Sequence, residues 1–390
     1  MLGFLLNGFT QLFTTMAAPA LLAGVVLGII IGVLPGLTAT MGIALLIPLT
    51  YYVSPSIGLS LLIGIFAGGI YGGSVSAILL KTPGTPAAGA TILDGYPMAQ
   101  SGQAGKAIAI ATIASAIGGL IGAGNQVTSN SSACSTGNEA IIDALWRIRT
   151  GLAKRMIAGG SEGATPYIWG GFDAMRVICR KYNDNPTAGS RPLSATACGF
   201  VPGSGGAMLV LEDLETALAR KARIYAEVIG GAVNSGGQRM GGSMTAPNPE
   251  GVKRCIRMAV ADAGIDPHQV DAINGHLTAT YADPIEVRNW AEALERTPDT
   301  FPYINSTKSL IGHCLGAAGA IESVAAVLQI YRGFIHPSIN SEDVHPDIAP
   351  FAAKIPQKCL EFPELKYLAK AGFGFGDVNS CIIFKKWEEK

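Results

Sequence analysis

The sequence predicts two different structures in one chain: an N-terminal α-helical membrane segment over residues 1–123, joined to an α/β layered domain over residues 124–390. The first observation is the charge distribution, because residues 1–123 contain only Lys81, Asp94 and Lys106 as charged side chains. The second is the presence of long apolar runs in that same part. The third is that short β-rich runs alternate with helical stretches further along, which is the pattern of layered helices and sheet.

The overall composition describes neither part well. The chain has 390 residues, a net charge of zero, 49% hydrophobic residues and only 14% charged residues, against about 25% charged in ordinary soluble domains. A neutral chain without a basic stripe gives no reason to expect a nucleic-acid partner. The 7 cysteines are odd in number, scattered and without a CxxC pair. We therefore expect no disulfide framework and no metal site, in a reducing cytosol.

The apolar runs of the first part have the length that a bilayer demands. About twenty apolar residues cross a bilayer core, and residues 17–35 and 57–80 meet that requirement without a charge. Residues 107–123 are marginal, and residues 40–53 are short and interrupted by Pro48. The alternative is the buried core of a soluble protein, but three nearly uncharged runs separated by short loops favour lipid.

Two Pro-Gly breaks, at 34–40 and 81–99, interrupt these runs. Broken helices of this kind usually line protein or a polar cavity and point to a transporter's substrate site, although two ordinary loops explain them equally well. Residues 2–122 resemble the large membrane subunit of the tripartite tricarboxylate transporters, on PGLTATMGIALLIPLTYYVSP and YGGSVSAILLKTPGTPAAGATILDGYPMAQSGQAGKA. The resemblance implies carboxylate uptake, but that subunit has many more spans, so we do not expect transport by this chain.

The second part opens on a cysteine placed before a helix. After Cys134, apolar residues recur at helical spacing, namely Ala140, Ile141, Ala144, Leu145 and Ile148. A thiol at a helix N-terminus lies near free N–H groups and the positive end of the macrodipole, which lowers its pKa. The alternative is a small buried cysteine, which is the commoner fate of any one cysteine.

Strands and helices alternate downstream of this cysteine. We predict strands over residues 154–160, 206–212, 222–233, 270–276, 366–374 and 378–387, and helices over residues 250–265 and 316–332. Two histidines lie in Gly/Thr/Ser-rich stretches, His276 in INGHLTAT and His313 in NSTKSLIGHCLGAAGAIE, and GFGFGDVN follows at 372–379. A lone histidine of this kind is more often structural, so the combination carries the functional interpretation.

Five motifs occur in order: SSACSTG, NDNPTAGSRP, INGHLTAT, NSTKSLIGHCLGAAGAIE and AGFGFGDVNSCIIF. Together they resemble the β-ketoacyl-acyl-carrier-protein synthases of the two-histidine type, over residues 124–387, and most of all the elongating enzymes of type II fatty acid synthesis. The resemblance implies a thiolase-like layered domain. It also implies an acyltransferase activity, the decarboxylative Claisen condensation that elongates fatty acids.

The resemblance assigns roles to residues at the matching positions. Cys134 would be the acyl-accepting nucleophile. His276 and His313 would donate hydrogen bonds to the enolate oxygen that forms as carbon dioxide leaves. Lys308 and Glu322 match the supporting lysine and glutamate around the second histidine, although a plain structural cation is the alternative for Lys308.

The remaining implied roles concern substrate binding. The backbone N–H groups of Cys134 and Phe375 would form the oxyanion hole, and Phe373 would lie with Phe375 near the pocket entrance. Thr278 and Thr280 match the pair that contacts the phosphopantetheine arm. No cofactor is implied, because the phosphopantetheine is supplied by the acyl carrier protein. The expected partners are that carrier protein, malonyl and acyl thioesters, and a second copy in a homodimer.

Several positions depart from the family pattern. The usual HGTST reads HLTAT, so that Leu277 and Ala279 replace smaller or polar residues. Asp377 stands in the final glycine loop, where its carboxylate opposes an anionic intermediate unless it points to solvent. Ser194 and Cys198 occupy positions that are often acidic in the family.

The largest departure is one of length. In this family roughly the first third precedes the nucleophile and supplies core strands, part of the acyl pocket and part of the dimer interface. Here membrane spans stand in its place, so we expect an incomplete condensing domain with exposed apolar edges and an insoluble or unfolded recombinant chain. The junction near residue 124 has no linker, which favours an accidental or engineered chimera over a natural tethered synthase. We expect a bacterial-type membrane protein whose C-terminal domain is cytoplasmic.

Overall fold

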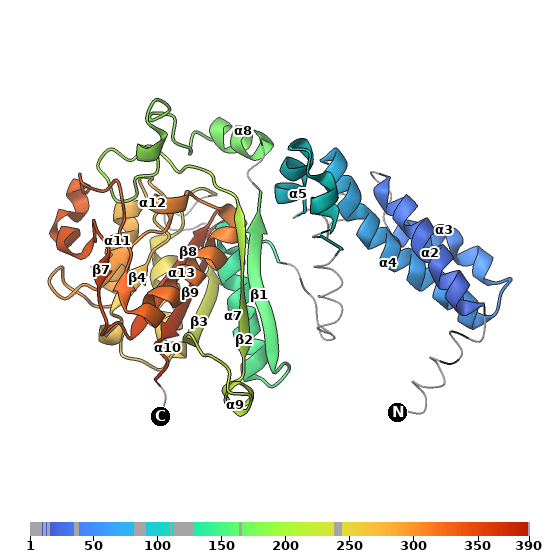
Figure 1. The fold of residues 1–390 in the computed structure, drawn as a ribbon. Coiled ribbons are helices and arrows are strands. Elements are labelled where there is room, and N and C mark those ends of the chain that lie inside the picture. Colours follow the sequence, from blue (N-terminus) through green and yellow to red (C-terminus); the bar gives the residue numbers. More distant parts are fainter. Residues whose placement is uncertain are drawn as a thin grey trace. The chain divides into compact units, whose positions relative to one another are not determined.

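The computed structural model describes residues 10, 13, 16–34, 39–81, 91–109, 111–112, 128, 130–163, 166–237 and 244–388. The chain divides into two compact units, Met1–Gln126 and Val127–Lys390, and each is described by itself (Figure 1). The first unit contains helices only among its described residues, whereas the second combines helices with strands.

The named helices in the described part of the first unit are α2 (Ala17–Val33), α3 (Ala39–Thr50), α4 (Pro55–Leu80) and α5 (Thr91–Gln100). Helix α4, with 26 residues, is the one described helix long and apolar enough to cross a membrane. Helix α2 has 17 residues, the lower limit for a bilayer core, and α3 is shorter and contains Pro48. Most of the marginal span at 107–123 lies outside the described residues.

The structure describes the two predicted Pro-Gly breaks only in part. Residues 35–38 of the first break and 82–90 of the second lie outside the described residues. The end of the second break is helical, because α5 covers Thr91–Gln100 with Pro97 inside it. The prediction that these segments form a polar substrate site therefore stays a prediction.

Helices α2 and α4 pack along a seam of glycines. Their contact glycines recur every fourth residue, which places them on one face of each helix, and they are Gly24, Gly28 and Gly32 on α2 with Gly64, Gly68 and Gly72 on α4. A Cβ added at Gly28 would lie 2.3 Å from the carbonyl oxygen of Ile65. Small residues at this spacing allow the close helix approach that membrane helices use.

The second unit is built on a five-stranded sheet in the order β3-β9-β8-β4-β5. The strands are β3 (Glu227–Ser235), β4 (Ala272–Asn274), β5 (Tyr303–Asn305), β8 (Tyr367–Gly374) and β9 (Val378–Lys385). Strand β4 is parallel to both of its neighbours, and the β3–β9 and β8–β9 pairs are antiparallel. A mixed sheet with crossover helices confirms the layered α/β prediction.

Helices cover both faces of this sheet (Figure 1). Side chains alternate across it because the strand period is two. Leu368 and Ile382 pack with α7 (Thr136–Arg149) and α13 (Ala318–Arg332). Their chain neighbours pack with α10 (Pro249–Asp262) and α11 (Asp283–Ala293) on the other face. The two predicted helices are confirmed as α10 and α13, and all six predicted strand regions contain a strand, although the third begins only at Glu227.

A separate two-stranded sheet pairs β1 (Arg155–Glu162) with β2 (Gly205–Glu212) in antiparallel register. One of its faces contributes Ala158 and Leu211 to the core with α7 and α13. Its other face leaves apolar side chains exposed, with Ile157 60%, Met208 58% and Val210 67% exposed. Among the described residues β1 and β2 pair only with each other, which agrees with the predicted shortage of strands in this half of the domain.

Shorter elements connect these layers. They are α8 (Pro166–Ala174), α9 (Leu214–Ala219), α12 (Lys308–Ile311), β6 (Phe334–Ile335), β7 (Leu360–Glu361), and 3₁₀ turns at Ala133–Ser135, Pro186–Ala188, Pro267–Gln269, Leu315–Ala317 and Pro346–Lys354. Two of these turns, at Ala133–Ser135 and Leu315–Ala317, lie immediately before α7 and α13. They bring the ends of these two helices to the candidate site.

Candidate active site

Cys134 lies in the 3₁₀ turn Ala133–Ser135, directly before α7. The preceding Ala133 has φ +49°, a left-handed conformation that costs a non-glycine residue of order 1–3 kcal/mol. The backbone of the final glycine loop packs closely behind the turn, because a Cβ added at Gly374 would lie 3.2 Å from the amide nitrogen of Cys134 and 2.9 Å from the carbonyl oxygen of Ser132. This close contact requires glycine and holds the backbone of the turn that carries Cys134.

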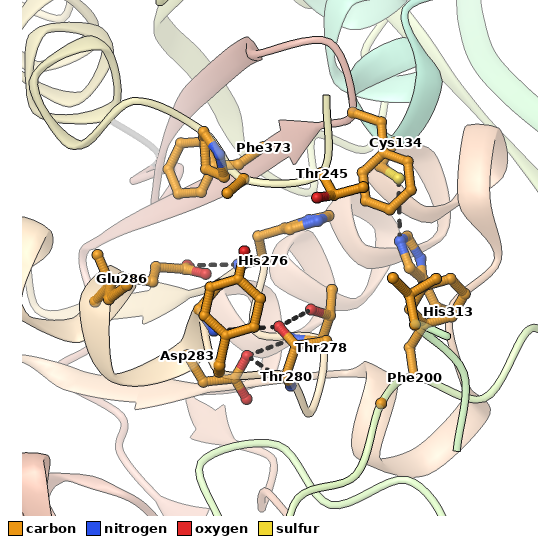
Figure 2. Close-up of a pocket in the computed structure, with 18 of the residues that line it drawn as sticks. Cys134, Phe200, Thr245, His276, Thr278, Thr280, Asp283, Glu286, His313 and Phe373 are labelled. Carbon is orange, nitrogen blue, oxygen red and sulfur yellow. Dashed lines mark hydrogen bonds between the residues drawn. The ribbon is translucent and has the colours of Figure 1, made fainter. Parts of the chain in front are cut away.

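The thiol and the two histidines converge on one cavity of about 540 Å³ (Figure 2). His276 follows β4, and His313 follows α12. The Nε2 atom of His313 lies 3.1 Å from Sγ of Cys134, and the two imidazole rings meet edge to face at 5.3 Å. The sulfur and one nitrogen of each ring all lie within 4.8 Å of one another.

The backbone determines which nitrogen of His313 carries the proton. The N–H of Leu315 donates to Nδ1 of His313 at 3.2 Å, so Nδ1 must accept. In a neutral imidazole the other nitrogen is then the donor. His313 therefore directs Nε2–H at the sulfur of Cys134. The same residue is held by two backbone hydrogen bonds, its N–H to Val201 and its carbonyl oxygen from Gly203.

Burial dominates the protonation of this cluster. It raises the pKa of the Cys134 thiol to about 11, against the opposing effects of the Lys308 charge and the backbone N–H groups of Phe375 and Cys134. The prediction that a helix N-terminus lowers this pKa is wrong, because loss of hydration outweighs those stabilising groups. Burial also holds the pKa values of His276 and His313 well below their usual range, helped by the nearby positive charge of Lys308.

A buried ionic cluster lies behind the histidines. The ammonium of Lys308 lies 2.6 Å from one oxygen of Glu322, and the ammonium of Lys370 lies 2.7 Å from the other. All three side chains are at least 98% buried. Lys370 was not among the sequence-predicted residues, although a lysine inside an apolar strand next to the glycine loop is a recognisable signal.

The loop after His276 is held by two carboxylates at the start of α11. Asp283 accepts hydrogen bonds from the backbone N–H groups of Thr278 and Ala279, at 2.8 and 3.0 Å. Glu286 accepts from those of His276 and Leu277, at 2.7 and 2.8 Å. Sequence reasoning did not select Glu286 for any role. Its place three residues after Asp283, on the same side of a helix, is the signal that was available.

The two substitutions in the HLTAT motif lie in left-handed conformations. Leu277 has φ +23° and Ala279 has φ +62°, conformations in which glycine is preferred. The hydrogen bonds to Asp283 and Glu286 therefore stabilise a strained loop. The hydroxyl groups of Thr278 and Thr280 lie 3.1 Å apart, and both residues line the cavity (Figure 2).

Aromatic rings complete the cavity wall. The rings of Phe373 and His276 meet edge to face with 6.1 Å between their centroids. The rings of Phe200 and His313 meet in the same way with 5.1 Å between their centroids. Phe375 lies in the cavity lining beside Phe373, and its backbone N–H acts on the thiolate of Cys134. The sequence did not point to Phe200, which reaches the site only through tertiary packing.

Asp377 faces neither solvent nor the cavity. It is fully buried, has φ +64°, and one carboxylate oxygen accepts the backbone N–H of Asn248 at 2.8 Å. The expected conflict between this carboxylate and an anionic intermediate is thus avoided by orientation inside the protein, not by exposure to solvent. Ser194 is buried as well and donates to Asp343 at 2.5 Å.

Comparison with known families assigns the two parts of the chain separately. Residues 19–128 match the family described as "Tripartite tricarboxylate transporter TctA family". Residues 225–342 match the family described as "Beta-ketoacyl synthase, C-terminal domain". Two sequence families are therefore joined in one chain, and the second unit has the thiolase-like fold of the ketosynthases.

Individual relatives support the second assignment. The chain is 39% identical over 273 residues to 3-oxoacyl-[acyl-carrier-protein] synthase I of Arabidopsis thaliana chloroplasts, covering 69% of this chain and 55% of that relative. It is 38% identical over 260 residues to 3-oxoacyl-[acyl-carrier-protein] synthase 1 of Escherichia coli K12, covering 66% and 61%. The chain thus spans little more than half the length of the curated relatives it matches.

Solved structures give the same result. A type II polyketide ketosynthase in complex with its acyl-carrier protein superimposes with a TM-score of 0.65 at 34% identity, over 70% of this chain and 66% of that chain. A β-ketoacyl synthase from Burkholderia phymatum gives a TM-score of 0.61 at 34% identity, over 66% and 61%.

Proposed function

We propose that the second unit is a β-ketoacyl-acyl-carrier-protein synthase that performs decarboxylative condensation between an acyl thioester and a malonyl thioester. The observation that carries this proposal is the convergence of Cys134, His276 and His313 on one buried cavity. A thiol stores an acyl group as a thioester, and two neutral imidazoles supply N–H donors for a developing oxyanion.

In the first step, the sulfur of Cys134 attacks the carbonyl carbon of the acyl thioester. The oxygen of the tetrahedral intermediate accepts hydrogen bonds from the backbone N–H groups of Cys134 and Phe375. The bond to the carrier's sulfur breaks, and the proton of the Cys134 thiol leaves with that sulfur. Because the pKa of this thiol is about 11, the reaction begins from the neutral thiol. The Nε2–H of His313 stabilises the negative charge that develops on the sulfur as the thiol loses its proton.

In the second step, the malonyl carbon–carbon bond breaks and carbon dioxide leaves. The electron pair forms an enolate whose oxygen accepts hydrogen bonds from His276 and His313. The α-carbon then attacks the thioester carbonyl on Cys134, and the released thiolate regains a proton. The pair Lys308–Glu322 supports His313, and Lys370 adds a second buried positive charge that keeps both imidazoles neutral.

The phosphopantetheine arm is substrate, carried by the acyl carrier protein. Thr278 and Thr280 fit an amide of that arm, because two hydroxyl groups 3.1 Å apart line the cavity and offer both donors and acceptors. Phe373 forms the apolar wall beside them. We infer no other cofactor and no metal.

Two half-reactions test this proposal in the full chain purified in detergent. Acylation of the protein from an acyl-carrier protein, measured by intact mass, is expected in wild type and in Cys359→Ser but not in Cys134→Ala. Release of carbon dioxide from malonyl-carrier protein is expected in Cys134→Ala and lost in His276→Asn and His313→Asn. An adduct retained by Cys134→Ala, or decarboxylation unaffected by both histidine changes, would contradict the assignment.

The alternative function, carboxylate uptake, rests on the family match at residues 19–128. We propose that this segment is a fragment of a tricarboxylate transporter subunit that serves here as a membrane anchor, since α4 alone among the described helices has the length of a span. Uptake of radiolabelled citrate by vesicles containing the chain is expected to equal that of empty vesicles. Uptake that depends on residues 34–40 and 81–99 would instead establish the permease.

We further propose a bacterial-type membrane protein with the second unit in the cytoplasm and paired with a second copy. Digestion of that unit by protease in inverted, but not in right-side-out, vesicles tests the orientation. Crosslinking to a species of twice the chain mass tests the pairing.

A further inference from the structure

Two further thiols lie next to each other at the cavity, and one of them lines its wall. Cys198 lines the cavity together with Cys134, and its Sγ lies 2.6 Å from Sγ of Cys179. That separation is well inside van der Waals contact and about half an ångström longer than a disulfide bond of about 2.05 Å. The remaining five cysteines have no such sulfur neighbour among the described contacts.

The backbone holds these two cysteines side by side. Cys179 donates its N–H to the carbonyl oxygen of Phe200 at 2.9 Å, and Phe200 donates to that of Val177 at 3.1 Å. Gly199 between them has φ +113°, and a Cβ there would lie 2.5 Å from the carbonyl oxygen of Val177. The two chain segments therefore run together at a fixed distance, and bond formation requires only a small movement of the two side chains.

We propose that Cys179 and Cys198 are a site of reversible oxidation, at which a peroxide converts the two thiols to a disulfide in the cavity wall. Disulfides in cytosolic proteins are usually transient and catalytic or redox-sensing. The two sulfur atoms of this pair are close enough to form such a bond. The proposal does not depend on condensing activity.

The chemistry balances with hydrogen peroxide as the only co-reactant. The sulfur of one cysteine attacks one oxygen, the O–O bond breaks, and the departing hydroxide takes the proton of that thiol to become water, which leaves a sulfenic acid. The sulfur of the other cysteine then attacks the sulfur of the sulfenic acid, the S–O bond breaks, and the proton of the second thiol leaves with the hydroxyl group as a second water. The thiol pair loses two electrons, and the peroxide gains them.

Positive side chains surround one member of the pair. Burial raises the pKa of Cys198 to about 11, with its contact to Cys179 acting in the same direction and the charge of Lys181 acting against it. A second, smaller cavity beside Cys198 is lined by Arg176, Arg180 and Lys181. Positive side chains of this kind stabilise the thiolate that reacts with oxidants.

The new bond would act directly on the proposed active site. Phe200 lies two residues after Cys198 and packs edge to face on His313 at 5.1 Å. A disulfide closes the 179–198 segment into a loop and fixes the wall on which this ring rests. We therefore expect oxidation to change the rate at which an electrophile reaches Cys134.

Peptide mapping of the full chain after peroxide treatment tests the proposal. The expected product is a disulfide-linked pair of tryptic peptides, one containing Cys179 and the other Cys198, that dithiothreitol separates. Dimedone labelling of the exposed Cys359 shows in the same sample that the peroxide has acted. In Cys198→Ser the linked pair disappears, and dimedone is expected to trap sulfenic acid at Cys179.

Two results would overturn the inference. One is full alkylation of both cysteines in wild type after Cys359 has been oxidised. The other is a linked peptide in which either cysteine pairs with a different partner. Because wild type alone decides both results, a folding defect in the variant does not affect the conclusion. Loss of condensing activity in other experiments leaves this mapping unchanged, which separates the two proposals.

Discussion

Alkylation of Cys134 by iodoacetamide is expected to be slow near neutral pH and to accelerate about tenfold with each pH unit. Burial raises the pKa of this thiol to about 11, so only about one molecule in 1,000 is ionised at about pH 8. A free thiol of pKa about 8.5 is about one-quarter ionised at that pH. The buried site therefore offers roughly 250-fold less thiolate.

Part of this deficit is offset by reactivity. A thiolate of higher pKa is the stronger nucleophile, and a Brønsted coefficient of about 0.4–0.5 over about 2.5 pKa units restores roughly 10- to 20-fold. The expected result is a rate about 10- to 25-fold below that of N-acetylcysteine at about pH 8, before any restriction of access. Raising the pH from about 7 to about 9.5 should give a straight logarithmic plot of unit slope.

The assay is peptide-resolved mass spectrometry of Cys134 labelling in the full chain, with Cys134→Ser as the blank. A rate that reaches a plateau below about pH 8 would refute the reasoning. It would mean that His313 carries the proton as an imidazolium and stabilises a thiolate, against the hydrogen bond that its Nδ1 accepts from Leu315.

Three further predictions concern stability. Glu322→Gln leaves two buried ammonium groups without a counter-charge and should cost about 3–5 kcal/mol of unfolding free energy. Lys308→Met leaves the Lys370–Glu322 ion pair, whose charges cancel, and should cost less. Urea denaturation measures both. Burial raises the pKa of Glu286 to about 7. The protonated Glu286 therefore contributes stability that is complete below about pH 4.5 and is lost as the pH rises through about 7. The unfolding free energy should fall by up to about 3 kcal/mol over this interval, and Glu286→Gln should abolish the slope. Val210→Lys on the exposed face should increase the soluble fraction in a sedimentation assay at nearly constant melting temperature, whereas the same change at the buried Leu211 should unfold the unit.

Short apolar runs were sufficient to locate most strands of the second unit. Strands β8 and β9 contribute to a core on each of their two faces, so they appear in the sequence as continuous apolar runs. The start of β3 was placed too early, because residues 222–226 are apolar and strand-like yet pair with no described strand. Local composition does not show whether a neighbouring strand is available.

The candidate site divides in the same way. The motifs identified Cys134, His276 and His313, and their local Gly and Thr residues marked backbone that approaches closely. The sequence did not identify Lys370, Glu286 or Phe200, because each acts on the site through a contact with a residue distant along the chain. The prediction that the pKa of the Cys134 thiol is lowered was wrong for a related reason. A helix N-terminus can be recognised from the local sequence, whereas burial depends on the whole fold.

The amino-acid sequence by itself determined that this chain has a nearly uncharged apolar part and a layered α/β part, and it selected the candidate residues for the proposed chemistry. Those properties depend on local spacing and residue type. Only the tertiary structure decided that one thiol and two imidazoles share a cavity, that His313 offers Nε2–H to the sulfur, and that Asp377 turns away from it. Each of these depends on which groups exclude water from one another, and that is a property of the packed molecule.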